Sequence, residues 1–301
     1  MIFGILKRLG VEMGLGEFFK SEKPGLSFEL YPPKTDEGVE LLLQAVGELI
    51  AYSPDFFTCT YGAGGSTRDR TLQILSEVKS RFNIPVASHL TCVGSTVEQL
   101  RGYLETAIAQ GTEHIVALRG DPPKGQTEFT QTDGGLQYAN ELVALIRSEF
   151  PQLGIAVAGY PEVHQEAPNA EVDLVNLKRK VDAGSDIIVT QLFYINDDFF
   201  RFRDRCVAAG ISIPIVPGIL PVTNLSQIQR IASLCKANLP VSFVARLGEK
   251  PEPEWQFSAG VEFAQQQVAE LLSNGVPGVH FYVLNKSQAT AEVLKSHWSN
   301  S

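Results

Sequence analysis

The stretch that decides the fold is His114-Ile115-Val116-Ala117-Leu118-Arg119-Gly120-Asp121-Pro122-Pro123, an apolar run that ends abruptly in charged and turn residues. Four consecutive apolar residues between turn residues are typical of a strand covered on both faces, as in a parallel sheet beneath helices. The two prolines cannot donate hydrogen bonds to a sheet, and they restrict the backbone of Asp121. We therefore expect Asp121 at the carboxyl end of a buried strand, where ligands bind in parallel sheets.

The same unit of apolar strand, polar loop and amphipathic helix recurs along the chain. The predicted strands are residues 26–30, 56–60, 86–90, 114–118, 155–159, 187–191, 215–219 and 279–283. The predicted helices are residues 39–52, 68–82, 97–110, 136–150, 170–183, 198–209, 224–234 and 255–274, with a last short helix after Asn285. Helices between consecutive strands force right-handed parallel crossovers, and eight units in about 250 residues fit a closed barrel.

The fold class expected is therefore α/β, a (β/α)8 TIM barrel. We expect one catalytic barrel domain over residues 26–301, preceded by an N-terminal helical extension over residues 1–25 in which residues 1–19 form an amphipathic helix. The stretch 248–253 contains two prolines and is predicted to be an insertion before the last strand. The beginning of the chain lacks the features of a signal peptide, and no run is apolar for long enough to cross a bilayer.

Composition narrows the class of protein. The 301 residues are 44% hydrophobic and 20% charged, with a net charge of -9, so a nucleic-acid or membrane-surface partner is not expected. The chain has four dispersed cysteines without a Cys-x-x-Cys pair: Cys59, Cys92, Cys206 and Cys235. This pattern predicts reduced, buried thiols in a cytoplasmic protein, and we expect no structural metal.

Polar side chains follow the apolar strands at the points where the strands end. They include a carboxylate and two histidines on separate strands, and the full set is Glu29, Thr60, His89, Arg119, Gly120, Asp121, Tyr160, His164, Gln191 and Lys286. Taken singly, a carboxylate at a strand end can equally cap a helix or pair with an arginine, and a histidine can be a packing residue. Their convergence at one end of a barrel predicts a cofactor site.

Two further patterns have competing interpretations. One predicted helix carries four polar residues with the spacing of a single face: Asp173, Asn176, Arg179 and Lys180. This face is either an ordinary solvated surface or a site for a pyrophosphate and ribose hydroxyls. The glycine-rich stretch 62–65 matches neither phosphate-loop fingerprint, and a tight turn before a helix is the better interpretation.

Assembled in order, these motifs resemble bacterial-type methylenetetrahydrofolate reductases, with the catalytic barrel alone. The resemblance extends from about Ser27 to Lys286. Its motifs are Ser27-Phe-Glu-Leu-Tyr-Pro-Pro33, Thr60-Tyr-Gly-Ala, His89-Leu-Thr-Cys92, the stretch from His114 to Asp121, Tyr160-Pro-Glu-Val-His164, Asn176-Leu-Lys-Arg-Lys-Val-Asp-Ala-Gly184, Thr190-Gln191, Arg201-Phe-Arg-Asp-Arg-Cys206 and Pro217-Gly-Ile-Leu-Pro221.

The resemblance implies a cytoplasmic oxidoreductase of one-carbon metabolism and methionine biosynthesis. FAD would take a hydride from NADH or NADPH and pass it to 5,10-methylenetetrahydrofolate by a ping-pong mechanism, giving 5-methyltetrahydrofolate. Glu29 matches the general acid, whose proton we expect the flanking Phe28, Tyr31, Pro32 and Pro33 to retain by desolvation. Asp121 matches a catalytic carboxylate that also binds the pterin, and Gln191 matches a folate-binding amide.

The resemblance also gives the positions expected to bind FAD, and the sequence differs from the family at two positions. The FAD positions fall on Thr60, His89, Arg119, Gly120, Asp121, Tyr138, Tyr160, His164, Asp173, Asn176, Arg179 and Lys180. Leu225 replaces a substrate-stacking aromatic residue, and Lys286 replaces an arginine, keeping a charge for the glutamate tail of the folate without the bidentate fork. The resemblance also implies a homo-oligomer, and we expect no carboxyl-terminal regulatory domain.

Two other functions fit a barrel with these strand ends. A Schiff-base lyase would use Lys34, Lys124 or Lys286, although none of these lysines lies inside an apolar strand that would lower its pKa. A pterin-binding barrel would present a methylated folate to a partner without catalysing a reaction. That protein would be colourless, whereas the reductase would carry a flavin.

Overall fold

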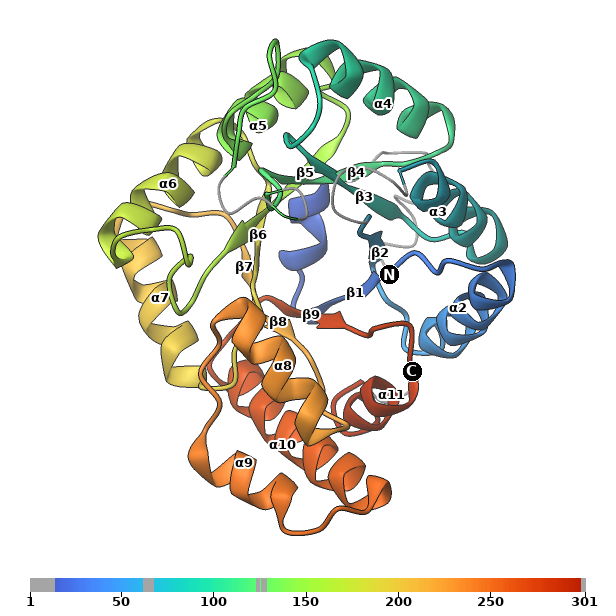
Figure 1. Cartoon of the computed structure of the whole chain (residues 1–301), viewed down its shortest axis with the longest axis vertical. Helices are drawn as coiled ribbons and strands as arrows, with labels where there is room; N and C mark the ends of the chain where they lie inside the picture. The colour runs from blue at the N-terminus through green and yellow to red at the C-terminus, as the bar shows by residue number, and fades with distance from the viewer. Residues whose placement is uncertain (1–13, 62–67, 123–124, 126–128, 299–301) are drawn as a thin grey trace.

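A ring of parallel strands surrounded by helices forms the core of the protein (Figure 1). The computed structural model describes residues 14–61, 68–122, 125 and 129–298. The strands of this part are β1 (Gly25–Leu30), β2 (Phe56–Cys59), β3 (Val86–Thr91), β4 (His114–Leu118), β5 (Gly154–Gly159), β6 (Ile187–Thr190), β7 (Ile215–Val216), β8 (Gly218–Ile219) and β9 (Gly278–Tyr282). This architecture confirms the predicted (β/α)8 barrel, because each predicted strand is found within one or two residues of its expected bounds.

The barrel closes where one predicted strand is split in two. Pro217 lies between β7 and β8 and has no N–H to donate to a ladder. On one side of it β7 pairs with β6, and on the other side β8 pairs with β9. The carbonyl of Pro217 accepts a hydrogen bond from the backbone N–H of His280 at 2.9 Å. The seventh strand therefore passes from one neighbour to the other and completes the ring.

Helices cover the outside of the ring. In the described part they are α2 (Asp36–Ile50), α3 (Arg68–Phe82), α4 (Val97–Ala109), α5 (Ala139–Glu149), α6 (Ala170–Asp182), α7 (Asn196–Ala208), α8 (Leu225–Cys235), α9 (Val241–Gly248), α10 (Pro253–Ser273) and α11 (Gln288–Lys295). The short helix α9 was not predicted. The stretch 248–253, expected as an insertion before the last strand, joins the end of this additional helix to the beginning of α10.

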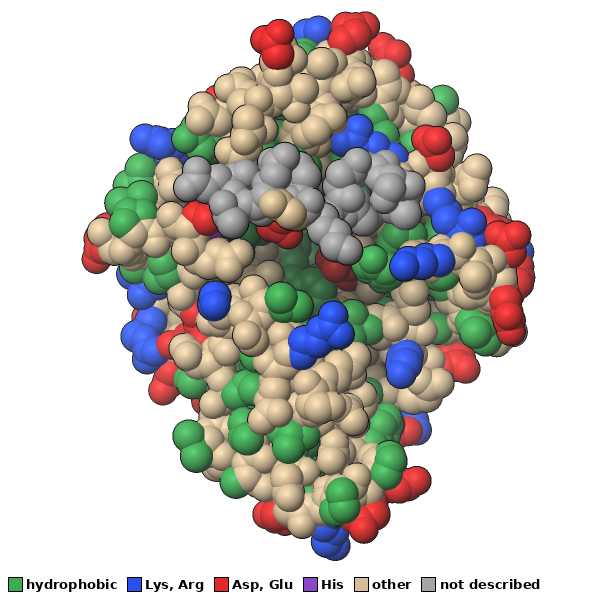
Figure 2. All heavy atoms as spheres, viewed as in Figure 1, with side chains coloured by type: hydrophobic (Ala, Val, Ile, Leu, Met, Phe, Trp, Pro, Cys, Tyr) green, Lys and Arg blue, Asp and Glu red, His purple; other side chains and the backbone are tan. Residues whose placement is uncertain are grey.

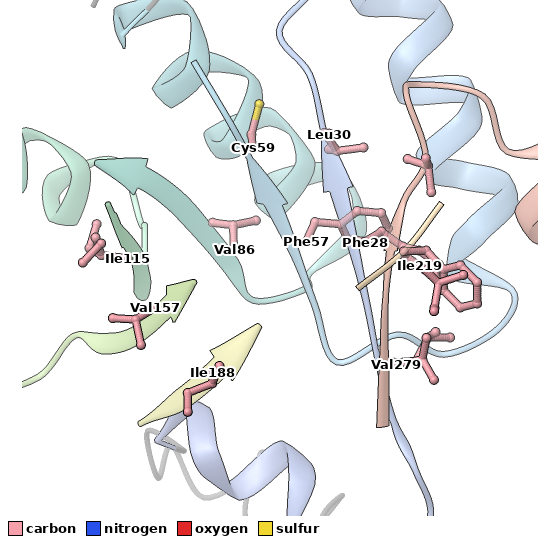
Figure 3. Close-up of a cluster of buried hydrophobic side chains, with 14 of the residues drawn as sticks. Phe28, Leu30, Phe57, Cys59, Val86, Ile115, Val157, Ile188, Ile219 and Val279 are labelled. Carbon is pink, nitrogen blue, oxygen red and sulfur yellow. The ribbon is translucent and has the colours of Figure 1, made fainter. Parts of the chain in front are cut away.

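Strand alternation separates the core from the site. On β1, Phe28 faces outward and packs against the ring of Phe57, with ring centroids 5.3 Å apart, and against that of Phe281 at 6.1 Å. Figure 3 shows this apolar layer, to which successive strands contribute side chains. Because neighbouring residues on a strand point to opposite faces, Ser27 and Glu29 point into the barrel.

A short 3-10 helix, η1 (Leu15–Phe19), packs at the amino ends of the strands. Its buried Phe18 contacts Phe56 and His114, with ring centroids 5.9 and 5.8 Å apart. An amphipathic helix was predicted over residues 1–19, of which 1–13 lie outside the described residues. In the described part the packing is as expected, but the helix type is 3-10. This packing fills the amino end of the barrel, on the side away from the predicted site.

The four cysteines are free, and three of them are buried, in agreement with the predicted reduced thiols. Among the described helices, none is long and apolar enough to cross a membrane. The described residues also contain no group of three or more His, Cys, Asp or Glu side chains that could hold a metal ion.

Candidate functional site

A cavity of about 810 Å³ lies at the carboxyl ends of the strands. In the space-filling view it lies in the hollow near the centre of the ring, where hydrophobic and acidic side chains are visible (Figure 2). All predicted site residues except Lys286 line it: Glu29, Thr60, His89, Arg119, Gly120, Asp121, Tyr138, Tyr160, His164, Asp173, Asn176, Arg179, Lys180 and Gln191. The barrel thus brings together residues from six strands and their loops, and the roles assigned to them remain predictions.

Glu29 lies between two histidines on the inner wall of this cavity. Its Oε2 atom is 3.2 Å from Nε2 of His89 on β3 and 3.9 Å from Nε2 of His280 on β9. The other ring nitrogen of His280, Nδ1, is hydrogen-bonded to the hydroxyl of Ser27 at 2.8 Å. Ser27 and His280 are opposite each other in the register of β1 and β9, so strand pairing fixes this row of groups.

The environment of Glu29 differs from the predicted one. Burial raises the pKa of its carboxyl group, but the interactions with His89 and His280 outweigh burial and lower the pKa to about 2. Desolvation of Glu29 was expected from Phe28, Tyr31, Pro32 and Pro33, and burial does raise its pKa, but Phe28 faces the outer helices and Tyr31 is half exposed. At a pKa of about 2, Glu29 is a carboxylate at neutral pH.

His280 and Tyr282 line the cavity but were not among the predicted site residues. The Tyr282 hydroxyl donates a hydrogen bond to the carbonyl of Thr190 at 2.7 Å, and burial raises its pKa well above the ordinary value. Both side chains stand at alternate positions of β9, whose other residues are apolar. That alternation was the available signal for polar groups pointing into the barrel.

Asp121 reaches the cavity through a turn that requires glycine. Gly120 has a φ of +89°, a left-handed conformation that residues with a side chain rarely adopt. A Cβ atom at this position would lie 2.7 Å from Cγ1 of Val93. The turn brings the exposed carboxylate of Asp121 to the rim of the cavity directly after β4, where the two-proline signal predicted it.

Arg119, the residue before this turn, is paired with a carboxylate. Its Nη1 and Nη2 atoms donate to the two carboxylate oxygens of Glu166 at 2.6 and 2.5 Å. The ring of Phe129 lies 4.9 Å from the centre of the guanidinium. Arg119 in turn lowers the pKa of Glu166 through this hydrogen-bonded pair. Glu166 lies in a loop without a recognisable pattern, and we did not predict it as a site residue.

The polar face of α6 is divided between solvent and cavity. Lys180 donates from Nζ to the carbonyl of Ala158 at 2.6 Å, and burial lowers its pKa to about 8 against an opposing effect of Asp173. Asp173 accepts a hydrogen bond from the backbone N–H of His164 at 3.1 Å. Asn176 and Arg179 are exposed and bonded to each other at 3.2 Å. All four residues line the large cavity, Asn176 and Arg179 at its exposed part and Asp173 and Lys180 at its less exposed part.

Aromatic and amide groups complete the wall. The rings of Tyr160 and His164 meet edge to face, with centroids 4.6 Å apart, and burial raises the pKa of Tyr160. Gln191 accepts a hydrogen bond through Oε1 from the backbone N–H of Leu192 at 2.8 Å, which orients its amide. Tyr138 stands half exposed at the beginning of α5.

Lys286 lines a second cavity of about 80 Å³, between the residues that follow β8, helix α8 and the residues that follow β9. The two cavities share wall residues, including Leu220 and Tyr282. Leu225 packs with the apolar cluster beneath α8, and its backbone N–H donates to Gln256 at 2.9 Å. Leu225 lines neither cavity in the described part, so it does not itself take the place of the stacking aromatic residue.

Of the lysines proposed for a Schiff-base lyase, the two that the structure describes, Lys34 and Lys286, do not line the large cavity. Lys34 is exposed, Lys286 lines the smaller cavity and Lys124 lies outside the described residues. Among described lysines only Lys180 lines the large cavity, and its amine is bonded to a carbonyl. The geometry gives the lyase no support.

Comparison with known proteins identifies the family. The family model for methylenetetrahydrofolate reductase matches residues 15–297. The chain belongs to the methylenetetrahydrofolate reductase family. It is 40% identical over 265 residues to 5,10-methylenetetrahydrofolate reductase of Escherichia coli, covering 87% of each chain. It is 41% identical over 279 residues to methylenetetrahydrofolate reductase (NADH) 1 of Arabidopsis thaliana, covering 89% of this chain and 47% of that protein.

The chain therefore spans about half the length of its plant relatives in the methylenetetrahydrofolate reductase family and most of the length of its bacterial ones. Among solved structures, a protein from Clostridium thermocellum that binds two copies of 5-methyl-5,6,7,8-tetrahydrofolic acid is similar, with a TM-score of 0.60. It is 13% identical, and the match covers 92% of this chain and 95% of that one. At this identity the likeness shows a shared barrel fold.

Proposed function

We propose that this member of the methylenetetrahydrofolate reductase family reduces 5,10-methylenetetrahydrofolate to 5-methyltetrahydrofolate with NADH or NADPH, using FAD as the carrier of the hydride. Family membership supports the reaction, and the names of the plant relatives support NADH. The observation that carries the proposal is one cavity with the carboxylate of Glu29 on its inner wall and the cations Arg119, Arg179 and Lys180 around it. An acid near the reacting carbon and cations for phosphate groups are what this reaction requires.

The residues of the cavity fit FAD. Arg179 and Lys180 lie one turn after Asn176 and about two turns after Asp173 on the same helix, and the four match a diphosphate beside ribose hydroxyls. The Lys180 amine is partly buried and, within the described part of the chain, donates to the carbonyl of Ala158, while an ammonium group has three donors. When bound, FAD would supply the hydride chemistry, and the protein would hold it with one ring face open to the cavity.

Glu29 is the proposed source of the proton that opens the five-membered ring of the folate. With a pKa of about 2, the Glu29 carboxylate has to gain a proton for this role. His89 and His280 stand 3.2 and 3.9 Å from Oε2, and we propose that the proton reaches Glu29 through one of these imidazoles. Ser27 holds the imidazole of His280 in place through Nδ1.

Asp121 and Gln191 are the proposed pterin ligands. A carboxylate has two oxygen acceptors that suit the paired N–H donors of a pterin ring, and the Gln191 amide can donate and accept. Both line the same cavity as Glu29. Because the nicotinamide and the pterin would use one open face of the cofactor, they would occupy this cavity in turn, which is the physical basis of the proposed ping-pong order. We extend the proposal to a cytoplasmic homo-oligomer that supplies methyl groups for methionine synthesis.

The visible absorption spectrum of the purified full-length protein tests the flavin proposal. We expect a yellow protein, and about tenfold or more weaker flavin binding in a Lys180→Met variant, since a lost hydrogen bond to a charged group costs about 1.5–3 kcal/mol. Lys178→Met is the matched control, because Lys178 lies on the same helix, is paired with Asp182 and is not among the cavity residues of the described part. A protein that stays colourless after incubation with FAD would contradict the proposal and favour the pterin-binding barrel.

A further inference from the structure

The charges around the large cavity do not suit a phosphate-bearing ligand as they stand. Among the described lining residues there are three cations, Arg119, Arg179 and Lys180, and the wall also carries the carboxylates of Glu29, Asp121, Glu166 and Asp173. Both terminal nitrogens of Arg119 donate to Glu166, so this carboxylate covers the end of the guanidinium fork. A phosphate group approaching Arg119 therefore meets a carboxylate first.

Glu166 is the carboxylate that is free to turn away. Its side chain is 44% exposed, and it lies on the loop between β5 and α6. Asp173, by contrast, is held by the backbone N–H of His164 at 3.1 Å, and Glu29 is held in the barrel by strand pairing. A half-exposed glutamate can exchange its partner for water at low cost, whereas a partly buried carboxylate cannot.

The backbone keeps Glu166 opposite Arg119. The N–H of Glu166 donates to Nδ1 of His164 at 3.2 Å, and the N–H of Ala167 donates to the carbonyl of His164 at 2.9 Å. Val163 has a φ of +74°, which is strained for a β-branched residue. Such strain persists only where the surrounding structure fixes it, so this tight turn has a defined position.

Arg119 would keep its position without Glu166. The ring of Phe129 lies 4.9 Å from the guanidinium, a cation–π distance, and is independent of the carboxylate. When Glu166 turns outward, the fork of Arg119 is exposed to the cavity in the same place. The planar fork that binds a carboxylate through two oxygens binds a phosphate in the same way.

We propose that Glu166 is a displaceable counter-ion, which holds Arg119 in the ligand-free protein and gives it up to a phosphate group of the incoming cofactor. The inference rests on the proposed flavin function and adds a residue that sets affinity for the phosphate-bearing part of the ligand. Glu166 is thus a specificity-determining residue that weakens binding of an anionic cofactor and leaves binding of a neutral one unaffected.

Fluorescence titration of the flavin-depleted full-length protein with FAD and with riboflavin tests this inference. Riboflavin has the same ring system without phosphate. Glu166→Gln and Glu166→Ser should each lower the dissociation constant for FAD about fivefold, the equivalent of one exposed ion pair, and change that for riboflavin less than twofold. Glu149→Gln is the matched control, because Glu149 forms the same two-bond pair with Arg101 on the surface.

The outcomes separate the counter-ion role of Glu166 from the proposed flavin function. If the wild-type protein binds FAD and both Glu166 variants bind it equally well or more weakly, the counter-ion role is overturned while the flavin function stands. A parallel gain for riboflavin would also overturn it, since the effect would then not depend on phosphate. If the wild-type protein and all variants bind no flavin, the proposed function and the counter-ion role fail together.

Discussion

A Glu29→Gln variant should still lose its flavin absorbance on addition of NADH at the wild-type rate, while its reduction of methylenetetrahydrofolate falls by about 10²- to 10⁴-fold, the usual contribution of a general acid. Glutamine has the size of glutamate and can still bond to His89 and His280, but it has no proton to give to the folate. The first half-reaction needs no proton from this position. The two rates should be measured separately by anaerobic stopped-flow absorbance.

Glu113→Gln is the matched control for this variant. Glu113 is paired with Lys79 at 2.7 Å and lies just before β4, at the opposite end of the barrel from the site. It should leave both half-reactions unchanged. Equal losses in the two half-reactions of Glu29→Gln would instead mean that Glu29 acts on the flavin or on folding, and no loss in the second would remove its role as the acid.

A Gly260→Ala substitution should lower the free energy of unfolding by about 3 kcal/mol, the upper part of the range for overpacked sites. Gly260 lies inside α10, and a Cβ atom there would lie 1.8 Å from the backbone oxygen of Val222. Backbone atoms cannot yield as a flexible side chain can, so α10 must move away from the residues that follow β8. Those residues line the smaller cavity, so the binding of substrate should weaken as well.

Gly102→Ala provides the matched control, because Gly102 lies inside α4 and a Cβ atom there would meet no neighbouring side chain or element within 4 Å. Alanine at an open helical position should stabilise the protein by about 0.5–1 kcal/mol. Urea unfolding of the two variants separates the effects. If both variants were destabilised to the same degree, the close approach of α10 to Val222 would not be the reason why position 260 requires glycine.

Local sequence patterns were enough to predict the barrel. The strands are short apolar runs bounded by turn residues, and the helices between them have a regular apolar face, so each unit could be recognised from its own residues. Pro217 was visible in the sequence, but the exchange of partners between β7 and β8 depends on the whole ring closing. Helix α9 was missed because it follows α8 without a strand between them, and so falls outside the repeating unit of strand, loop and helix.

Site residues could be predicted from the sequence where they directly follow a recognisable strand. Asp121 and Arg119 were found because two prolines and a glycine mark the end of β4. Glu166 was missed because its partner Arg119 is 47 residues away and nothing in its own loop indicates the pairing. The pKa of Glu29 could not be predicted for the same reason: it depends on His89 and His280, which are brought beside Glu29 only when the strands of the barrel pair.

The central claim is that one cavity passes a hydride from a nicotinamide to a folate through bound FAD. Anaerobic addition of NADH and then of methylenetetrahydrofolate to the wild-type protein, followed at the visible flavin band, tests it most directly. The account predicts that the absorbance falls with NADH alone and returns when the folate is added, with one 5-methyltetrahydrofolate formed per flavin. An absorbance that falls with NADH but does not return with the folate would contradict it.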